Sequence, residues 1–270
     1  NEGFATHLSS FYLEKKYPAN TIINRKNLIN NITSQPGGSV KVNDTTNVGR
    51  IFDGRLSYNK GSSLLYMLRW KLTDSVFFKA LKTYQQDNKV IYGFARTADL
   101  KRHLEQTSGQ DLTEFFNDWF VGQGYPSYNV EWTPVGSKYV RIKMSQTTSH
   151  PSVNFFEMPV ALKFKNATQE KTIVVDNTTN GEIFLKNLGF VADSVFVDPE
   201  YWLLSRNNTT TKVQDIINGQ SVVQVYPNPI QNQFSVYLRN FVSPSAVITL
   251  FNAAGQRLYT KNINLINGSE

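Results

Sequence analysis

The 270-residue chain contains no cysteine, only three histidines and no long uninterrupted hydrophobic run. The missing cysteines exclude a disulfide framework and thiolate metal ligands, although they do not identify the compartment. No stretch approaches the roughly 18 consecutive apolar residues that a membrane-spanning helix needs, so we expect no transmembrane segment. His7, His103 and His150 lie far apart and form no His-x-x-x-His pair, so we expect surface or packing roles for them.

Dense runs of one charge are also missing. The net charge is +7, but the lysines and arginines are spread along the chain, and the nearest approach to a run is the pair Lys15 and Lys16. Electrostatic binding of nucleic acid needs clustered positive charge. We therefore expect no nucleic-acid partner.

What the sequence does contain is enough apolar material for buried cores: 40% of its residues are hydrophobic and 13% aromatic. This length favours two or three structural units. Residues 1–124 show mainly helical spacing, with Pro18 closing the first helix, Thr97 as a plausible cap and a Leu-rich stretch over 62–72. An aromatic helix over 111–121 is expected, with Asp111 and Glu114 at capping-box spacing and glycines after its end.

After residue 124 the hydrophobic period changes from about 3.6 to 2, which indicates strands. Val140, Ile142 and Met144 alternate with polar side chains, and the same pattern recurs over 160–165. We expect a small β-sandwich at 125–205, a polar linker at 206–220 and a further strand-rich unit at 221–270. The last unit has too few strands to close a sandwich, so we expect it to be truncated.

The opening string NEGFA, residues 1–5, places Glu2 in the first turn of a helix. Position alone explains such a residue as a solvated carboxylate that suits the helix dipole. The string resembles, however, the segment of the aminopeptidase N type zinc metallopeptidases, or gluzincins, that follows their His-Glu-x-x-His helix. In that family the matching glutamate is the third protein ligand of zinc, so the resemblance implies the same role for Glu2.

Two further blocks resemble the same family in the same order. LSYNKGSSLLYMLR, residues 56–69, is similar to its Tyr-x-Lys-Gly block, whose tyrosine lies in the active site and corresponds here to Tyr58. The stretch 99–126 is similar to a block in which a Ser-Gly-x-Asp-Leu turn leads into an aromatic helix and then Gly-Tyr-Pro. The phenylalanines and the tryptophan of that helix are expected to be core residues.

The resemblance implies zinc-assisted hydrolysis of N-terminal peptide bonds, with peptides as substrates. Catalytic zinc keeps three protein ligands and one open position for water. Glu2 would supply one of those ligands, and Tyr58 would donate a hydrogen bond to the developing oxyanion. Because the family's two zinc histidines and its general base have no counterpart here, we expect a downstream part of a longer enzyme that is inactive alone.

The stretch VYPNPIQNQFSVYL, followed by ITLFNAAGQRLYT, resembles the C-terminal sorting domain of proteins exported by the type IX secretion system of Bacteroidota. The turn Asn252 to Gly255 fits that pattern. The resemblance implies the type IX machinery as a partner and a secreted or surface-attached location.

The expected fold is therefore multidomain: the helical half of a thermolysin-like catalytic domain at 1–124, followed by two small Ig-like β-sandwiches, the last incomplete. Two other interpretations remain open. One is an endopeptidase or peptide-epoxide hydrolase of the same fold. The other is a noncatalytic surface-binding protein in which Glu2 and Tyr58 are only structural. An intact or a broken upstream zinc motif would separate enzyme from binder.

Overall fold

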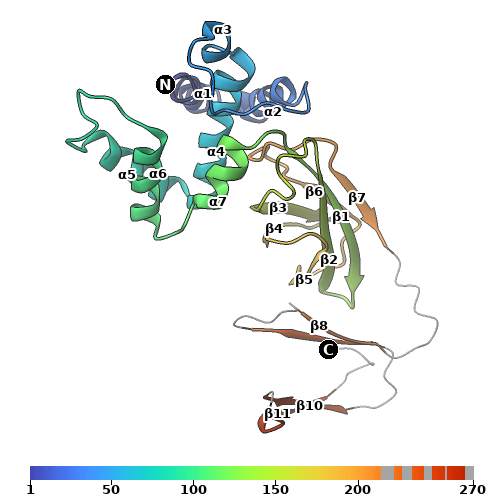
Figure 1. Ribbon diagram of the computed structural model, residues 1–270. Helices are drawn as coiled ribbons and strands as arrows, with labels where there is room; N and C mark the ends of the chain where they lie inside the picture. Colours follow the sequence, from blue (N-terminus) through green and yellow to red (C-terminus); the bar gives the residue numbers. More distant parts are fainter. Residues whose placement is uncertain (214–221, 227–232, 240–244, 253, 265–270) are drawn as a thin grey trace.

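A computed structural model describes residues 1–213, 222–226, 233–239, 245–252 and 254–264. Helices form the first part of the chain and strands the second, with the helical part beside a two-sheet sandwich (Figure 1). Within the described residues, no helix combines the length and apolar character needed to cross a membrane.

The helical part begins with a hairpin of two helices, α1 and α2, and its centre is the apolar helix α4. Its elements are α1 (Glu2–Lys16), the 3-10 turn η1 (Pro18–Asn20), α2 (Thr21–Ile32), α3 (Val48–Ile51), the π-helix η2 (Gly54–Lys60), α4 (Gly61–Leu72), α5 (Asp74–Gln85), α6 (Thr97–Ser108), α7 (Thr113–Phe115) and the π-helix η3 (Phe116–Val121). The ends of α1 at Lys16 and of α4 at Leu72 agree with the sequence pattern. Thr97 is the first residue of α6 and Arg96 takes the cap position that the sequence pattern gave to Thr97.

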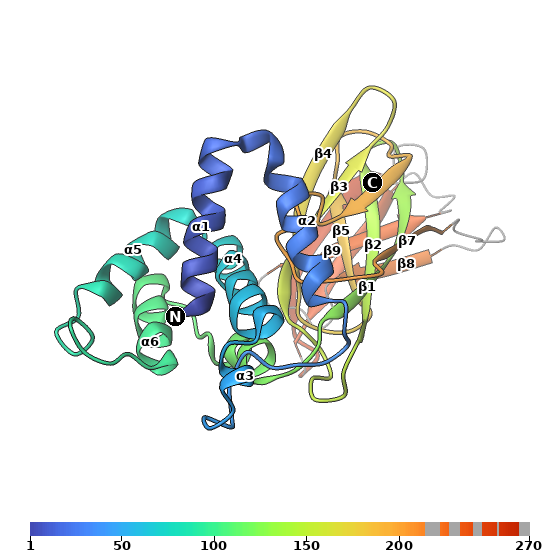
Figure 2. The same cartoon turned by 90° about the horizontal axis from the view of Figure 1, so that it is seen from above.

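Helix α4 is the core element of this part. It is buried over most of its length, with Met67 and Leu68 at 0% and 1% exposure. Such a helix, buried on nearly all sides, needs partners all round. Figure 2 shows α1 on one side of α4 and the sandwich on the other. Any displacement of α4 is therefore resisted from both sides.

The aromatic helix expected at 111–121 is present in a different form. Asp111 accepts from the Thr113 backbone N–H at 2.7 Å, and α7 begins with Leu112 as its cap residue, so the expected capping box does not form. After one turn the chain widens into η3, where the Gly122 N–H donates to the Asn117 carbonyl, five residues earlier. The expected role of the aromatic residues in the core is confirmed, since Trp119 is fully buried.

The sandwich consists of two sheets. One sheet has the order β5-β2-β1-β7 and the other β4-β3-β6. The strands are β1 (Pro126–Val135), β2 (Tyr139–Thr148), β3 (Met158–Lys165), β4 (Glu170–Asn177), β5 (Glu182–Asn187), β6 (Ser194–Val197) and β7 (Thr209–Lys212). Val140, Ile142 and Met144 are each 0% exposed, as their alternation predicts. Trp132 and Phe164 meet edge to face between the sheets, with centroids 5.8 Å apart.

One element corrects the expected linker at 206–220. Residues 209–212 form β7, which pairs in parallel with Asn129 to Trp132 of β1. The strand is exposed on its entire length, so no apolar alternation marks it in the sequence. Backbone pairing to β1 holds it in place. Residues 214–221 of the expected linker lie outside the described residues.

The helical part and the sandwich share one hydrophobic core. Buried residues from α4 through Trp119 and Phe156 to the sheets belong to a single cluster. The Trp119 and Phe156 rings are 4.4 Å apart, and the Trp70 indole N–H donates to the Pro159 carbonyl at 2.7 Å. The two parts are therefore packed as one body through this junction.

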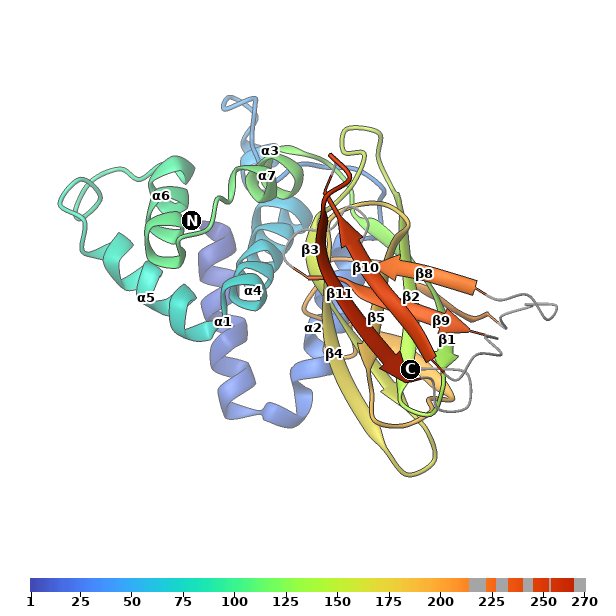
Figure 3. The same cartoon turned by 90° about the horizontal axis from the view of Figure 1, so that it is seen from below.

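The last described strands form two hairpins. They are β8 (Val222–Tyr226) with β9 (Ser235–Arg239), and β10 (Ser245–Phe251) with β11 (Arg257–Asn264), all antiparallel (Figure 3). In the expected turn, the Gly255 N–H donates to the Asn252 carbonyl. Tyr226 and Tyr237 pack with Val135 of β1 in a small separate cluster. Closure of an Ig-like sandwich by these hairpins stays a prediction, and the Tyr-Pro-Asn-Pro step falls largely outside the described residues.

Candidate active site

Glu2 lies in the first turn of α1, where a carboxylate suits the helix dipole. The next residue, Gly3, is packed against Gly61, the first residue of α4. A Cβ on Gly3 would lie 2.7 Å from the Gly61 carbonyl carbon and 2.9 Å from its Cα. Gly3 therefore needs the smallest side chain, and the contact fixes the start of α1 against the start of α4.

Tyr58 lies on the π-helix η2, three residues before Gly61. Such a helix is rare and requires specific support. The Asp53 carboxylate caps it by accepting from the Leu56 N–H at 2.7 Å. The Arg55 guanidinium donates to the carbonyls of Ile32 and Gly37, at 3.1 and 3.0 Å. The turn bearing Tyr58 is thus attached to the end of α2 and to the loop after it.

These two elements bring Glu2 and Tyr58 together. Partial burial raises the pKa of the Tyr58 phenol, and the hydrogen bond and the negative charge of Glu2 raise it further. A tyrosine hydroxyl with a raised pKa stays protonated at neutral pH and keeps its donor hydrogen. The sequence places the two residues 56 positions apart, and the structure makes them neighbours.

The described residues do not complete a zinc site around Glu2. A catalytic zinc ion takes three protein ligands. Among the residues that the structure describes, no group of three or more His, Cys, Asp or Glu side chains is arranged to hold a metal. Glu2 has the chemistry of a single zinc ligand.

The three histidines have other positions. His7, which also lies in α1, is 0% exposed and lies between the rings of Tyr66 and Phe77. Burial, with the cations of Arg69 and Arg25 nearby, lowers the pKa of His7 to about 3. His7 is therefore neutral at physiological pH.

His103 and His150 also have structural partners. The His103 Nε2 atom is 2.9 Å from the Asp87 carboxylate in the α5–α6 region. His150 is partly exposed, and its Nδ1 atom is 3.0 Å from the Ser152 hydroxyl. Neither of these contacts involves Glu2.

Lys60, two positions after Tyr58, is a buried lysine whose burial the sequence did not predict. Lys60 is 1% exposed, and its ammonium donates to the Gly38 carbonyl at 2.8 Å and to the Gly124 carbonyl at 3.3 Å. Burial, followed by the charge of Arg55, lowers the pKa of Lys60 to about 7. The Tyr-x-Lys-Gly pattern marks the residue, but no local periodicity predicts that a lysine would be buried there.

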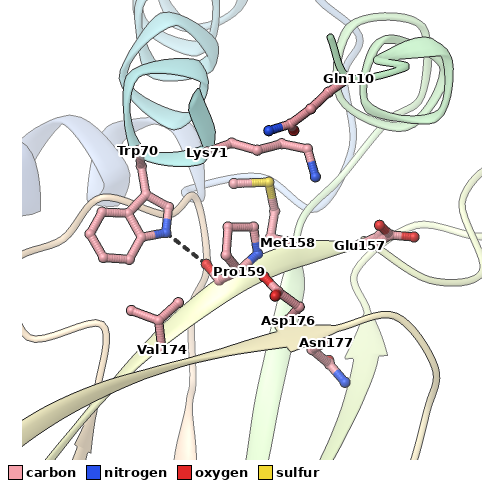
Figure 4. A pocket seen from close by; sticks show the side chains of 9 residues that line it. All are labelled: Trp70, Lys71, Gln110, Glu157, Met158, Pro159, Val174, Asp176 and Asn177. Carbon is pink, nitrogen blue, oxygen red and sulfur yellow. Dashed lines mark hydrogen bonds between the residues drawn. The ribbon is translucent and has the colours of Figure 1, made fainter. Parts of the chain in front are cut away.

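A pocket of about 420 Å³ lies near the C-terminal end of α4, where this helix meets β3 and β4 (Figure 4). Such a volume is within the range of small-molecule sites. It is lined by Trp70, Lys71, Gln110, Glu157, Met158, Pro159, Val174, Asp176 and Asn177. Glu2 and Tyr58 are not among the lining residues. Burial and the charge of Glu114 raise the pKa of Glu157, while Lys71 opposes this effect.

Comparison with known proteins places these features in a family context. Residues 1–119 match the model of the peptidase family M1 domain, and residues 224–270 match that of the secretion system C-terminal sorting domain. The chain is 30% identical over 202 residues to an alanine/arginine aminopeptidase of Saccharomyces cerevisiae, covering 70% of this chain and 23% of that protein. It is 34% identical over 92 residues to aminopeptidase N of Lactococcus lactis, covering 34% and 11%.

A third relative is aminopeptidase M1-C of Oryza sativa, 32% identical over 139 residues, or 48% of this chain and 15% of that protein. The chain thus spans about a quarter or less of the length of these curated relatives. The peptidase-domain match contains Glu2, Tyr58 and Lys60. The sorting-domain match begins within β8 and contains β9, β10 and β11. The chain therefore carries a segment of the aminopeptidase-type peptidase family M1 domain together with a secretion system C-terminal sorting domain.

Proposed function

We propose that this chain contributes the tyrosine and the glutamate of a zinc-dependent aminopeptidase active site. The observation that supports this most is the contact between Tyr58 and Glu2, whose charge and hydrogen bond raise the pKa of the phenol. The family match and the aminopeptidase relatives support the reaction class. The substrates would be peptides with a free N-terminus.

Tyr58 acts as a hydrogen-bond donor in this proposal. When water attacks a peptide carbonyl, its oxygen becomes negative, and a fixed O–H group stabilises that charge. Because the pKa of Tyr58 lies above its ordinary value, the donor hydrogen is present throughout the neutral range. Loss of such a donor costs about 2.7–4 kcal/mol of transition-state stabilisation.

Glu2 acts as the carboxylate ligand of zinc in this proposal. When bound, the metal supplies an acidic water and a Lewis acid for the carbonyl. The remaining ligands would have to come from residues other than those described here. Glu2 is only partly exposed, and the Gly3–Gly61 contact directly follows it, so its helix turn is held in a fixed position.

Replacement of Tyr58 tests the donor role. In the full-length protein, Tyr58→Phe should lower kcat for aminoacyl substrates by about two orders of magnitude while bound zinc is unchanged. Tyr139→Phe, on the exposed side of β2, is the matched control and should have no effect. Near-normal turnover by Tyr58→Phe, with the fold intact, would contradict the role.

Replacement of Glu2 tests the ligand role. In the full-length protein, Glu2→Gln should release zinc during dialysis against a chelator, because an amide is a weaker zinc ligand than a carboxylate. Glu170→Gln, with its side chain 60% exposed, is the control. Retention of the full zinc content by Glu2→Gln removes Glu2 from the ligand set. The 270-residue chain alone should show neither peptidase activity nor stoichiometric zinc.

The sorting-domain match supports an address as well as a reaction. We infer export by the type IX secretion machinery and a secreted or surface-attached location. Fusion of residues 221–270 to a reporter in a type IX secreting bacterium would test this. Export of the fusion, and retention when those residues are removed, is the expected result. Export of the reporter without them would contradict it.

A further inference from the structure

Lys60 has an unusual environment for a charged side chain. It is 1% exposed, and the structure gives its ammonium two backbone carbonyls as hydrogen-bond partners, those of Gly38 and Gly124. No carboxylate forms an ion pair with it among the described residues. Burying a cation without a counter-ion is costly unless carbonyl dipoles compensate it. A residue retained at such a cost calls for a structural or functional reason.

The two carbonyls belong to different parts of the molecule. Gly38 lies in the loop after α2, and Gly124 lies in the connection from η3 to β1. Both glycines have positive φ angles, +110° and +91°, and Cβ atoms there would lie 2.6 Å from Leu56 and from Ser149, respectively. The two segments are also joined directly, because the Gly38 N–H donates to the Gln123 side chain at 3.0 Å. The ammonium thus lies where three segments of the chain converge.

The same lysine is the last residue of η2, two positions after Tyr58. The backbone of Lys60 is part of the turn that carries the Tyr58 phenol, and its side chain is fixed by the two carbonyls. On its other side this turn is limited by Gly61, whose own backbone is packed against Gly3 beside Glu2. A movement of Lys60 would be passed to Tyr58 along a single short helical turn.

We propose that Lys60 is a positioning residue that holds Tyr58 against Glu2 by donating from one ammonium to the Gly38 and Gly124 carbonyls. The effect of this positioning on catalysis rests on the proposed function, whereas the positioning of Tyr58 by Lys60 does not depend on it. It makes the placement of the phenol depend on the junction between the helical part and the sandwich. Arg55 is the other charged group that acts on Lys60, and it is attached to the Ile32 and Gly37 carbonyls of the same loop.

The test follows Tyr58 by spectroscopy in the 270-residue chain, without any need for activity. The chain is labelled with 3-fluorotyrosine, and the ¹⁹F resonance that disappears in Tyr58→Phe is assigned to Tyr58. Lys60→Met keeps an unbranched side chain, shorter by one atom, and removes its donors. In this variant the resonance and its titration midpoint should shift towards those of free 3-fluorotyrosine. Lys79→Met, an exposed substitution on α5, should leave both unchanged. A folded Lys60→Met protein with an unchanged Tyr58 resonance and midpoint overturns the proposal.

A second measurement uses the wild-type chain and does not depend on the folding of a variant. Carbonyl ¹³C shifts of Gly38 and Gly124 report on the loss of the ammonium proton as pH rises. The Tyr58 ¹⁹F resonance should change with the same midpoint, before its own phenol titrates. Carbonyl shifts that titrate while the Tyr58 resonance does not respond would overturn the proposal.

Turnover in the full-length protein separates this inference from the proposed function. If both hold, Lys60→Met should lower kcat, and the Lys60→Met/Tyr58→Phe double variant should lose no more kcat than Tyr58→Phe alone. If the Tyr58 resonance moves in Lys60→Met but Tyr58→Phe has normal kcat, the positioning stands and the oxyanion role of Tyr58 fails. The spectroscopic result therefore tests the positioning by Lys60, and the kinetic result tests the oxyanion role of Tyr58, independently of each other.

Discussion

Substitution of Gly3 by alanine would test how closely α1 and α4 must approach. The new Cβ would lie 2.7 Å from the Gly61 carbonyl carbon, whereas ordinary contacts begin at 3.4 Å. The helices would have to separate by 3.4 − 2.7 = 0.7 Å, and backbone atoms cannot rotate away as a side chain can. Overpacking of this kind costs about 1–3 kcal/mol. Alanine offsets about 0.5–1 kcal/mol of this cost because it is the better helix former.

The expected net loss in the free energy of unfolding is therefore between about 0 and 2.5 kcal/mol. Urea denaturation of the 270-residue chain, followed by tryptophan fluorescence, measures it. Gly54→Ala is a matched control, because a Cβ there meets no atom within 4 Å. It should be neutral or stabilising by about 0.5–1 kcal/mol. Gly61→Ala should be milder than Gly3→Ala, since its nearest atom is 3.2 Å away. A Gly3→Ala chain more stable than wild type would refute the close contact.

Two further predictions concern buried charge. The folded chain protonates His7 only near pH 3 but the unfolded chain near 6.5, so wild type should lose up to about 5 kcal/mol of stability as pH falls through this window. His7→Leu should lose correspondingly less in acid denaturation, and equal acid sensitivity would argue against a neutral buried imidazole. Arg25→Met removes the cation stacked 3.6 Å from the Trp202 ring and paired with Glu14 at 2.7 Å. This variant should lose about 3 kcal/mol in the free energy of unfolding measured in urea. The double variant with Glu14→Gln should recover part of that loss. Additive losses from the two single variants would contradict the coupling.

The strands and the principal helices could be predicted from the sequence because their patterns are local. The alternation ending at Met144 gives the buried face of β2, and the apolar stretch after Gly61 gives α4. The π-helices could not be predicted in this way. Apolar residues four and five positions apart fit the i→i+4 hydrogen bonds of an α-helix and the i→i+5 hydrogen bonds of a π-helix equally well. Contacts such as that of Trp119 with Phe156 come from distant segments.

The candidate site was predictable only as separate residues. NEGFA and the Tyr-x-Lys-Gly block identify Glu2 and Tyr58 by resemblance, but nothing local indicates that they are neighbours. Their proximity comes from the Gly3–Gly61 contact between two helices, and the burial of Lys60 comes from carbonyls 22 and 64 positions away. Long-range backbone interactions of this kind leave no periodic trace in a sequence.

The end of α2 shows where this polypeptide can be shortened. The carbonyl of Thr33 accepts from the Arg206 guanidinium and from the Tyr125 hydroxyl, so a residue far along the chain completes a helix near its start. Beyond Arg206, the Val213 N–H still donates to the Trp132 carbonyl. A gene trimmed at the end of β6, near residue 197, would remove the Arg206 donor from the end of α2 and leave the Thr33 carbonyl with the Tyr125 hydroxyl. A cut after Val213 keeps both attachments.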